Sequence, residues 1–143
     1  FLNDGLVVYE MDGRGGRRNW AVMENGRLTE MPMVVLVNEF SASASEVLVG
    51  ALQDHHRAKI VGTTTFGKGA VNVMRPLTNG GGLYMTYARW YTPEGRLIHG
   101  KGLEPDVEVK FPDRRDTDIA QLEKALELLE DLLAEREPTR AAS

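Results

Sequence analysis

The chain has 143 residues, enough for one domain whose folding buries about two thirds of the unfolded surface. Its net charge of -4 and the lack of a basic run argue against nucleic acid as a partner. No apolar stretch approaches the roughly 20 residues of a membrane-spanning helix, so we expect no stable membrane insertion by this segment. Zero cysteines exclude disulfides and thiol catalysis. Because the chain begins at Phe1 instead of a methionine, we expect it to be a piece of a longer protein.

The first third of the chain alternates between short apolar runs and turn residues. Residues 6–11 and 17–23 predict two strands, joined by the turn-rich loop 12–16. Residues 33–37 are continuously apolar and end at Asn38, which predicts a buried strand.

A helix is predicted directly after this buried strand. Ser43-Ala44-Ser45-Glu46 fits the capping box that opens a helix, and apolar residues then recur at helical spacing as far as Asp54. At the start of a helix, unpaired N–H groups and the helix dipole favour negative charge. Two interpretations stay open from the residues alone: Ser43 only caps the helix, or its hydroxyl is a nucleophile.

Lys68 stands between two glycines in Thr65-Phe66-Gly67-Lys68-Gly69. A serine hydroxyl needs a base to become a nucleophile, and Ser-Lys pairs are a known variant of the serine triad. A lysine acts as a base only when it is uncharged, which calls for burial or a neighbouring cation. If Ser43 and Lys68 form such a pair, we expect Lys68 to be largely buried, with its amine about 2.6–3.2 Å from the Ser43 hydroxyl, or somewhat farther in an inactive state. The alternative is a surface turn with an exposed lysine.

The second half of the chain predicts two more strands and a hairpin. Residues 58–62 form a short apolar strand and residues 107–109 a short final strand, and residues 71–77 and 83–92 flank a glycine turn. The strand at 83–92 is apolar or aromatic on both faces, which predicts an interior position. The alternation of strands, helices and hairpins indicates an α/β class fold, a mixed sheet with helices.

Residues 117–136 predict the clearest helix, because its large apolar residues are spaced three and four apart: Ile119, Leu122, Leu126, Leu129 and Leu133. This stripe either docks on the sheet or forms a seam for self-association. The stripe is short for a coiled coil, so docking is favoured. Residues 138–143 are expected to form a frayed tail.

Five blocks in order resemble the C-terminal processing peptidases, also called tail-specific proteases: residues 37–46, 51–54, 65–69, 88–96 and 100–107. The resemblance implies that Ser43 is the nucleophile and Lys68 the general base of a serine endopeptidase. Such an enzyme cleaves protein or peptide chains near their C-termini through an acyl-enzyme, with no cofactor. The resemblance also implies the Clp-protease/crotonase architecture and a place outside the cytoplasm, in the periplasm or cell envelope.

Further roles follow for individual residues. The family often places a glutamine four residues after the lysine to orient it, which implies a helper role for Asn72 here. The backbone N–H of Ala44, just inside the helix, is a candidate oxyanion donor. Asp54 lies three turns beyond Ser43, too far to bond it, so it is expected to support the helix end or a loop. The spacing of His55, His56 and His99 matches no metal motif, so no metal site is predicted.

Relatives usually carry a PDZ domain and a second oxyanion donor on an earlier strand, and neither is recognisable in this sequence. We therefore expect residues 1–112 to be the C-terminal portion of the catalytic core and 113–137 a helix packing on it. Such a portion is expected to be weak or inactive alone. A non-catalytic scaffold domain of the same fold and a crotonase-like acyl-CoA enzyme are the alternatives. The presence of both Ser43 and Lys68 argues against them.

Overall fold

The computed structural model describes residues 1–136, and these residues form two sheets and two helices. An antiparallel sheet has the order β2-β1-β6-β5, with β1 (Leu6–Asp12), β2 (Arg17–Ala21), β5 (Ala70–Pro76) and β6 (Gly82–Tyr91). A sheet of parallel strands has the order β3-β4-β7, with β3 (Val34–Val37), β4 (Lys59–Gly62) and β7 (Val107–Glu108). The helices are α1 (Ala44–Asp54) and α2 (Arg114–Ala134). The predicted mixed α/β fold is confirmed, and the predicted tail 138–143 lies outside the described residues.

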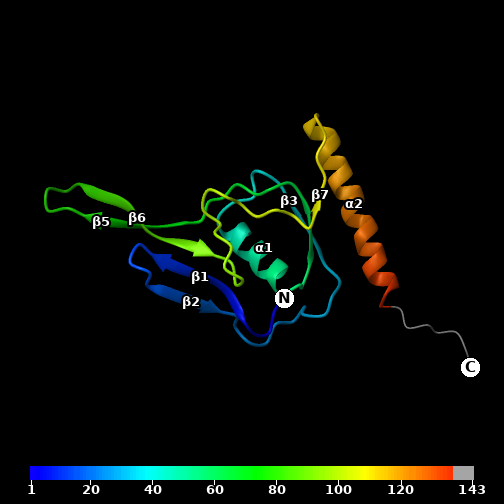
Figure 1. Ribbon diagram of the computed structural model, residues 1–143, viewed down its shortest axis with the longest axis horizontal. Coiled ribbons are helices and arrows are strands. Elements are labelled where there is room, and N and C mark those ends of the chain that lie inside the picture. The colour runs from blue at the N-terminus through cyan, green and yellow to red at the C-terminus, as the bar shows by residue number, and fades with distance from the viewer. Residues whose placement is uncertain (137–143) are drawn as a thin grey trace, which may run out of the picture.

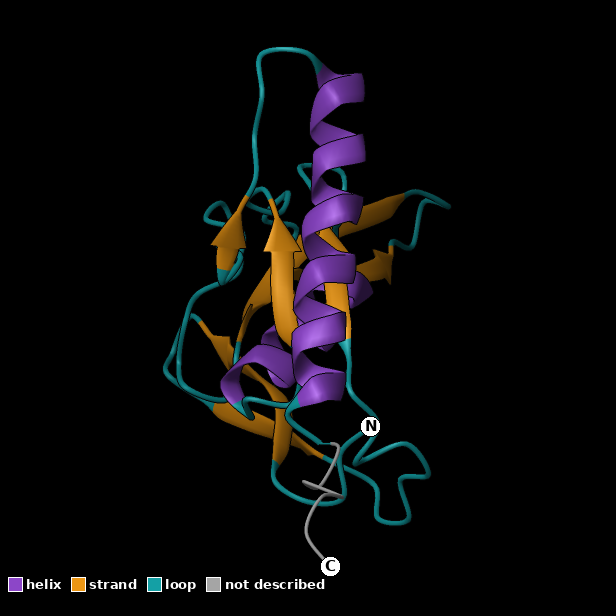
Figure 2. Cartoon of the chain, turned by 90° about the vertical axis from the view of Figure 1, so that its right-hand side faces the viewer, coloured by secondary structure: helices purple, strands orange, loops and turns teal. Residues whose placement is uncertain are grey.

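The elements are arranged in layers. Helix α1 contacts β1 and β4 and lies between the two sheets (Figure 1). Helix α2 packs across β3 and β4 of the parallel sheet (Figure 2). Neither helix is both long and apolar enough to cross a bilayer. The core is an apolar cluster that joins the parallel sheet, α1 and the loop after β6: Val37, Val49, Leu52, Ala58, Ile60, Ile98 and Leu103.

Strands β3 and β4 end at the same level of the parallel sheet. Val37 pairs with Gly62, and the N–H of Thr63 donates to the Val37 carbonyl at 3.1 Å. Gly62 has a φ of 142°, and a Cβ there would lie 1.8 Å from the Val37 oxygen. Only glycine allows this close approach. As a result, the segment leading to Ser43 and the segment leading to Lys68 leave the sheet side by side.

The β5–β6 hairpin differs from the sequence-based expectation. The predicted strand 83–92 forms and lies between β1 and β5 in its sheet, but its faces are not buried: Leu83, Tyr84, Met85 and Tyr87 are 41–65% exposed. Only the last residues of β6, from Ala88, pair with β1, while the rest of the hairpin projects from the body (Figure 1). Within residues 1–136 no element covers the projecting part. Apolar residues on both faces of the strand 83–92 therefore do not mean that the strand is buried.

Helix α2 docks by a different face from the one predicted. Its buried residues are Thr117, Gln121 and Ala125, whereas four of the five stripe residues are about half exposed: Ile119, Leu122, Leu126 and Leu133. Hydrogen bonds at the start of the helix set this rotation. Thr117 Oγ1 accepts from the N–H of Phe111 at 2.8 Å, and Gln121 Nε2 donates to the Val109 carbonyl at 2.9 Å. The predicted docking of the leucine stripe is wrong, and self-association through it stays a prediction.

The β1–β2 turn stabilises the charged form of the Asp12 carboxyl group. The backbone N–H groups of Arg14 and Gly16 donate to Asp12 Oδ1 at 2.8 Å. These bonds stabilise the ionised carboxylate and lower the pKa of Asp12. The turn lies apart from Ser43 and Lys68 in the sequence and takes no part in the site below.

The orientation of α2 is testable by lysine substitution. We expect Leu122→Lys and Leu126→Lys to change the free energy of unfolding by less than about 0.5 kcal/mol each, because these side chains already face solvent. Ala125→Lys should cost about 2–4 kcal/mol, because it forces a charge into the helix–sheet contact. Denaturant unfolding measures all three variants. The reverse ranking would mean that the leucine stripe docks on the sheet.

Candidate active site

Ser43 sits at a sharp turn between β3 and α1. Its φ of 59° and ψ of -119° fall in a region that side-chain-bearing residues avoid, at a cost of about 1–3 kcal/mol. The turn is fixed by its neighbours: Ser41 Oγ accepts from the N–H of Asn38 at 3.1 Å, and the Ser41 carbonyl accepts from the N–H of Phe66 at 3.0 Å. Strain of this kind on a strand–turn–helix segment is typical of a serine nucleophile.

The first turn of α1 leaves one N–H group available. The N–H of Ser45 donates to the Ala42 carbonyl at 3.2 Å, and that of Glu46 donates to the Ser43 carbonyl at 3.0 Å. The N–H of Ala44 has no hydrogen-bond acceptor among residues 1–136, and Ala44 is exposed. A free donor at the positive end of a helix is suited to bind a negatively charged oxygen.

Glu46 connects the nucleophile segment to the lysine segment. Its side chain is fully buried and accepts four hydrogen bonds. Oε2 accepts from the backbone N–H groups of Ser43 at 2.9 Å and Lys68 at 2.7 Å. Oε1 accepts from the Thr65 hydroxyl and from the N–H of Gly67, both at 2.6 Å. One carboxylate oxygen therefore holds the main chains of Ser43 and Lys68 within the combined length of two hydrogen bonds.

The lysine segment is also held from its other side by the loop 98–103. The N–H of Gly100 donates to the Gly67 carbonyl at 2.9 Å. Gly67 has a φ of 87°, and a Cβ there would lie 2.9 Å from the Gly102 nitrogen. A larger residue at position 67 would be both strained and in collision with this loop.

Lys68 itself is exposed, which contradicts the expectation that it is largely buried. Burial alternates along the segment 65–69: Thr65, Gly67 and Gly69 are buried, while Phe66 and Lys68 are exposed. The Lys68 amine forms no hydrogen bond with Ser43 Oγ and no ion pair within the described part of the chain. The structure thus brings the two main chains together and leaves the lysine side chain in solvent.

The other predicted site residues have structural contacts. The Asn72 amide oxygen accepts a hydrogen bond from the Thr86 hydroxyl across the β5–β6 hairpin. Asp54 supports the end of α1 and the next turn, as predicted, because its carboxylate binds the Arg96 guanidinium and accepts from the N–H of Glu94 at 2.8 Å. His55 Nε2 lies 2.8 Å from the Leu6 carbonyl oxygen.

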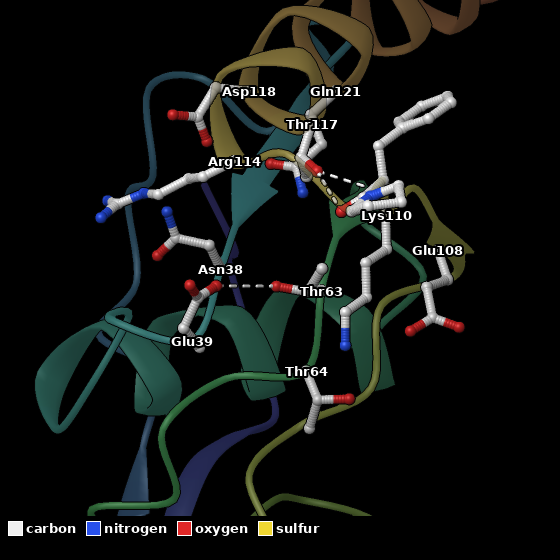
Figure 3. Close-up of a pocket in the computed structure, with 12 residues that line it drawn as sticks. Asn38, Glu39, Thr63, Thr64, Glu108, Lys110, Arg114, Thr117, Asp118 and Gln121 are labelled. Carbon is white, nitrogen blue, oxygen red and sulfur yellow. Dashed lines mark hydrogen bonds between the residues drawn. The ribbon is translucent and has the colours of Figure 1, made fainter.

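A cavity of about 390 Å³ opens beside the site, between the start of α2 and the carboxyl ends of β3 and β4 (Figure 3). Its lining includes Asn38 and Thr64, at the beginnings of the two segments, and Lys110, whose side chain extends toward Thr64 (Figure 3). The Arg114 guanidinium lies over the Phe40 ring, 4.5 Å from its centroid, which ties α2 to the segment before Ser43. Ser43 and Lys68 do not line this cavity.

Comparison with known proteins places this site in a family. Residues 1–109 match the model of peptidase family S41. The chain is 46% identical over 116 residues to the carboxy-terminal-processing protease of Bartonella bacilliformis, covering 78% of this chain and 26% of that protein. It also matches the structure of the photosystem II D1 C-terminal processing protease with a TM-score of 0.75 and 39% identity, covering 85% of this chain and 31% of the other. The chain belongs to peptidase family S41.

The structural matches also confirm the predicted Clp-protease/crotonase type of fold. The tricorn protease shares the fold with a TM-score of 0.50 at 19% identity, over 71% of this chain and 10% of the other. The chain spans about a quarter of the length of the Bartonella relative, so the activity of a whole protein is inferred below.

The strain at Ser43 is testable by comparing two substitutions. The free energy of unfolding of Ser43→Gly should exceed that of Ser43→Ala by about 1 kcal/mol, because glycine adopts a positive φ without a Cβ clash. Denaturant unfolding of the two variants measures the difference. If Ser43→Ala is the more stable of the two, the turn is not strained by the serine Cβ.

The role of Glu46 is testable by removing its charge. Glu46→Gln should lower the free energy of unfolding by about 3 kcal/mol or more, because an amide cannot accept from four donors. Asp106→Asn is the matched control, since that carboxylate also accepts a backbone N–H, from Ile60 at 2.7 Å, but contacts neither segment. Amide hydrogen exchange should accelerate at Ser43 and Lys68 in the Glu46 variant only. Equal exchange in both variants would contradict the linking role.

Proposed function

We propose that this chain carries the catalytic dyad of a serine endopeptidase, with Ser43 as nucleophile and Lys68 as general base. The observation that carries the proposal is the shared Glu46 carboxylate, which holds the strained Ser43 turn and the Lys68 main chain on one oxygen atom. The free N–H of Ala44 supports its assignment as an oxyanion donor. Membership of peptidase family S41 agrees with this chemistry.

The reaction then has two halves. Lys68 Nζ takes the proton of Ser43 Oγ while that oxygen attacks the scissile carbonyl carbon, and the Ala44 N–H stabilises the resulting oxyanion. When the C–N bond breaks, the Lys68 ammonium gives this proton to the leaving amine. Water then attacks the acyl ester while Lys68 takes a proton from the water. The C–O bond to Ser43 breaks, Lys68 returns the proton to Ser43 Oγ, and the carboxylic acid product leaves. Asn72 has a supporting role in this scheme, because its hydrogen bond with Thr86 holds the β5–β6 hairpin that follows Lys68 in the chain.

The exposure of Lys68 sets a condition on this mechanism. Water stabilises an exposed ammonium, so Lys68 acts as a base only when its surroundings are desolvated. We infer that a bound substrate, or protein outside residues 1–136, covers this face in the active enzyme. The exposed Phe66 beside Lys68 supports this inference, because an apolar ring is suited to pack under such a cover. Residues 1–143 alone should therefore hydrolyse peptides slowly.

Substrate and location follow from the relatives. The Bartonella relative is a carboxy-terminal-processing protease by name, and we propose the same substrate class here: protein or peptide chains cut near their C-termini. The resemblance supports action outside the cytoplasm. A scaffold domain without activity is the alternative, and it gives no reason for a strained serine turn joined to a lysine segment.

The dyad is testable with two matched lysines. Lys68 and Lys101 are both exposed and both stand between glycines, in Gly67-Lys68-Gly69 and Gly100-Lys101-Gly102. In the full-length protein, Lys68→Arg should reduce peptide hydrolysis to background, because a guanidinium stays protonated at working pH. Lys101→Arg should retain activity within about threefold, since this side chain has no part in the scheme. The measurement is the cleavage rate of an unfolded protein.

The same assay includes one further comparison. Ser43→Ala should abolish cleavage, because the substitution removes the proposed nucleophile. Normal turnover by Lys68→Arg would remove this lysine from the mechanism. Retained cleavage by Ser43→Ala would reject the serine peptidase assignment as a whole.

A further inference from the structure

Thr65 is a buried residue that the proposed chemistry does not use. It is 5% exposed, and its hydroxyl makes two hydrogen bonds. Oγ1 donates to Glu46 Oε1 at 2.6 Å and accepts from the N–H of Leu103 at 2.8 Å. We propose that Thr65 is a positioning residue, whose hydroxyl fixes the Gly67–Lys68 main chain through Glu46 and joins it to the loop 98–103. This inference rests on the proposed function.

The first step of the argument is the direction of the hydroxyl proton. The Leu103 N–H is a donor only, so the Thr65 oxygen must accept from it. The Glu46 carboxylate is an acceptor, so the Thr65 O–H must point to Oε1. The Thr65 hydroxyl thus satisfies one buried donor, the Leu103 N–H, and one buried acceptor, Glu46 Oε1. An apolar side chain of the same shape would leave both groups without this hydrogen bond.

The second step is what this hydroxyl restrains. Oε1 of Glu46 also accepts from the N–H of Gly67, next to the proposed base. Loss of the Thr65 donor removes one of the two bonds that hold this oxygen, so the carboxylate gains freedom to rotate. The Gly67 and Lys68 N–H groups then lose their fixed acceptor. The Lys68 Cα moves with them, and the reach of its amine to Ser43 Oγ changes.

The third step is the connection to the loop 98–103. Thr65 and Leu103 form a reciprocal pair, because the N–H of Thr65 also donates to the Leu103 carbonyl at 3.1 Å. The same loop donates from Gly100 to the Gly67 carbonyl. The lysine segment is therefore held between the buried carboxylate and this loop, and Thr65 is the side chain that contacts both.

The test uses three substitutions in the full-length protein. Thr65→Val keeps the shape but removes the hydroxyl, Thr65→Ser keeps the hydroxyl but removes the methyl, and Thr92→Val is the matched control. Thr92 is also buried, and its Oγ1 accepts from the N–H of Arg96 at 3.2 Å and forms no hydrogen bond with Glu46. We expect Thr65→Val to lower kcat about 10- to 100-fold with KM within about threefold, because substrate contacts are intact while the base is displaced. Thr65→Ser should recover kcat to within about threefold, and Thr92→Val should not lower it.

A second readout does not depend on catalysis. Amide hydrogen exchange at Gly67, Lys68 and Leu103 should accelerate in Thr65→Val and not in Thr92→Val. If Thr65→Val does not fold, Thr65→Ala against Thr65→Ser isolates the hydroxyl in the same two measurements. Equal kcat in the valine and serine variants, or unchanged exchange at these amides, would overturn the proposal. Failure of the dyad itself appears separately, as activity retained by Ser43→Ala or Lys68→Arg.

Discussion

The buried carboxylate of Glu46 is the interaction on which the site depends. Burying an ionised carboxylate is costly unless its lone pairs are satisfied, and here four donors surround it. Three of the four donors are backbone N–H groups of the two segments that carry the proposed dyad. The same bonds that compensate for desolvation therefore bring these segments together. A neutral or displaced side chain at this position would weaken the hydrogen bonds that hold the Ser43 and Lys68 segments together.

This arrangement divides the site into a rigid main chain and an accessible face. The main chains of Ser43 and Lys68 are fixed by hydrogen bonds and by glycines that permit close approach, such as Gly62 and Gly67. The Lys68 side chain, by contrast, points into solvent. Fixed positions reduce the reorganisation needed when charge develops in a reaction. The proposed base gains its reactivity only when water is excluded, so the proposed mechanism requires a cover over this face.

Two apolar surfaces of the described residues remain uncovered: the projecting part of the β5–β6 hairpin and the leucine stripe of α2. Each surface contains several neighbouring apolar residues instead of single scattered ones, and surfaces of this kind are typical of contact sites. The hairpin begins at Ala70, shortly after Lys68, so its projecting part continues from the lysine segment. The chain spans about a quarter of the length of its Bartonella relative.

The sequence by itself determined the elements and the two proposed catalytic positions. The apolar run at 33–37, the Ser43–Glu46 capping box and the helical spacing after it predicted the strand–turn–helix segment, because these patterns depend on neighbouring residues. The five family blocks singled out Ser43 and Lys68 in the same way. The tertiary structure alone decided which faces are buried. Hydrogen bonds at Thr117 and Gln121 turn the leucine stripe of α2 outward, and the absence of a covering layer within residues 1–136 exposes β6.

The tertiary structure also decided how the site is held. The capping box predicted one hydrogen bond of Glu46, to the N–H of Ser43, and no local pattern indicated the other three. Those bonds come from Thr65, Gly67 and Lys68, about 20 residues away along the chain, and they form only because β3 and β4 are parallel neighbours that end together. Local sequence specifies local geometry. Contacts between distant segments depend on how the whole chain packs, and for this protein those contacts connect the serine to the lysine.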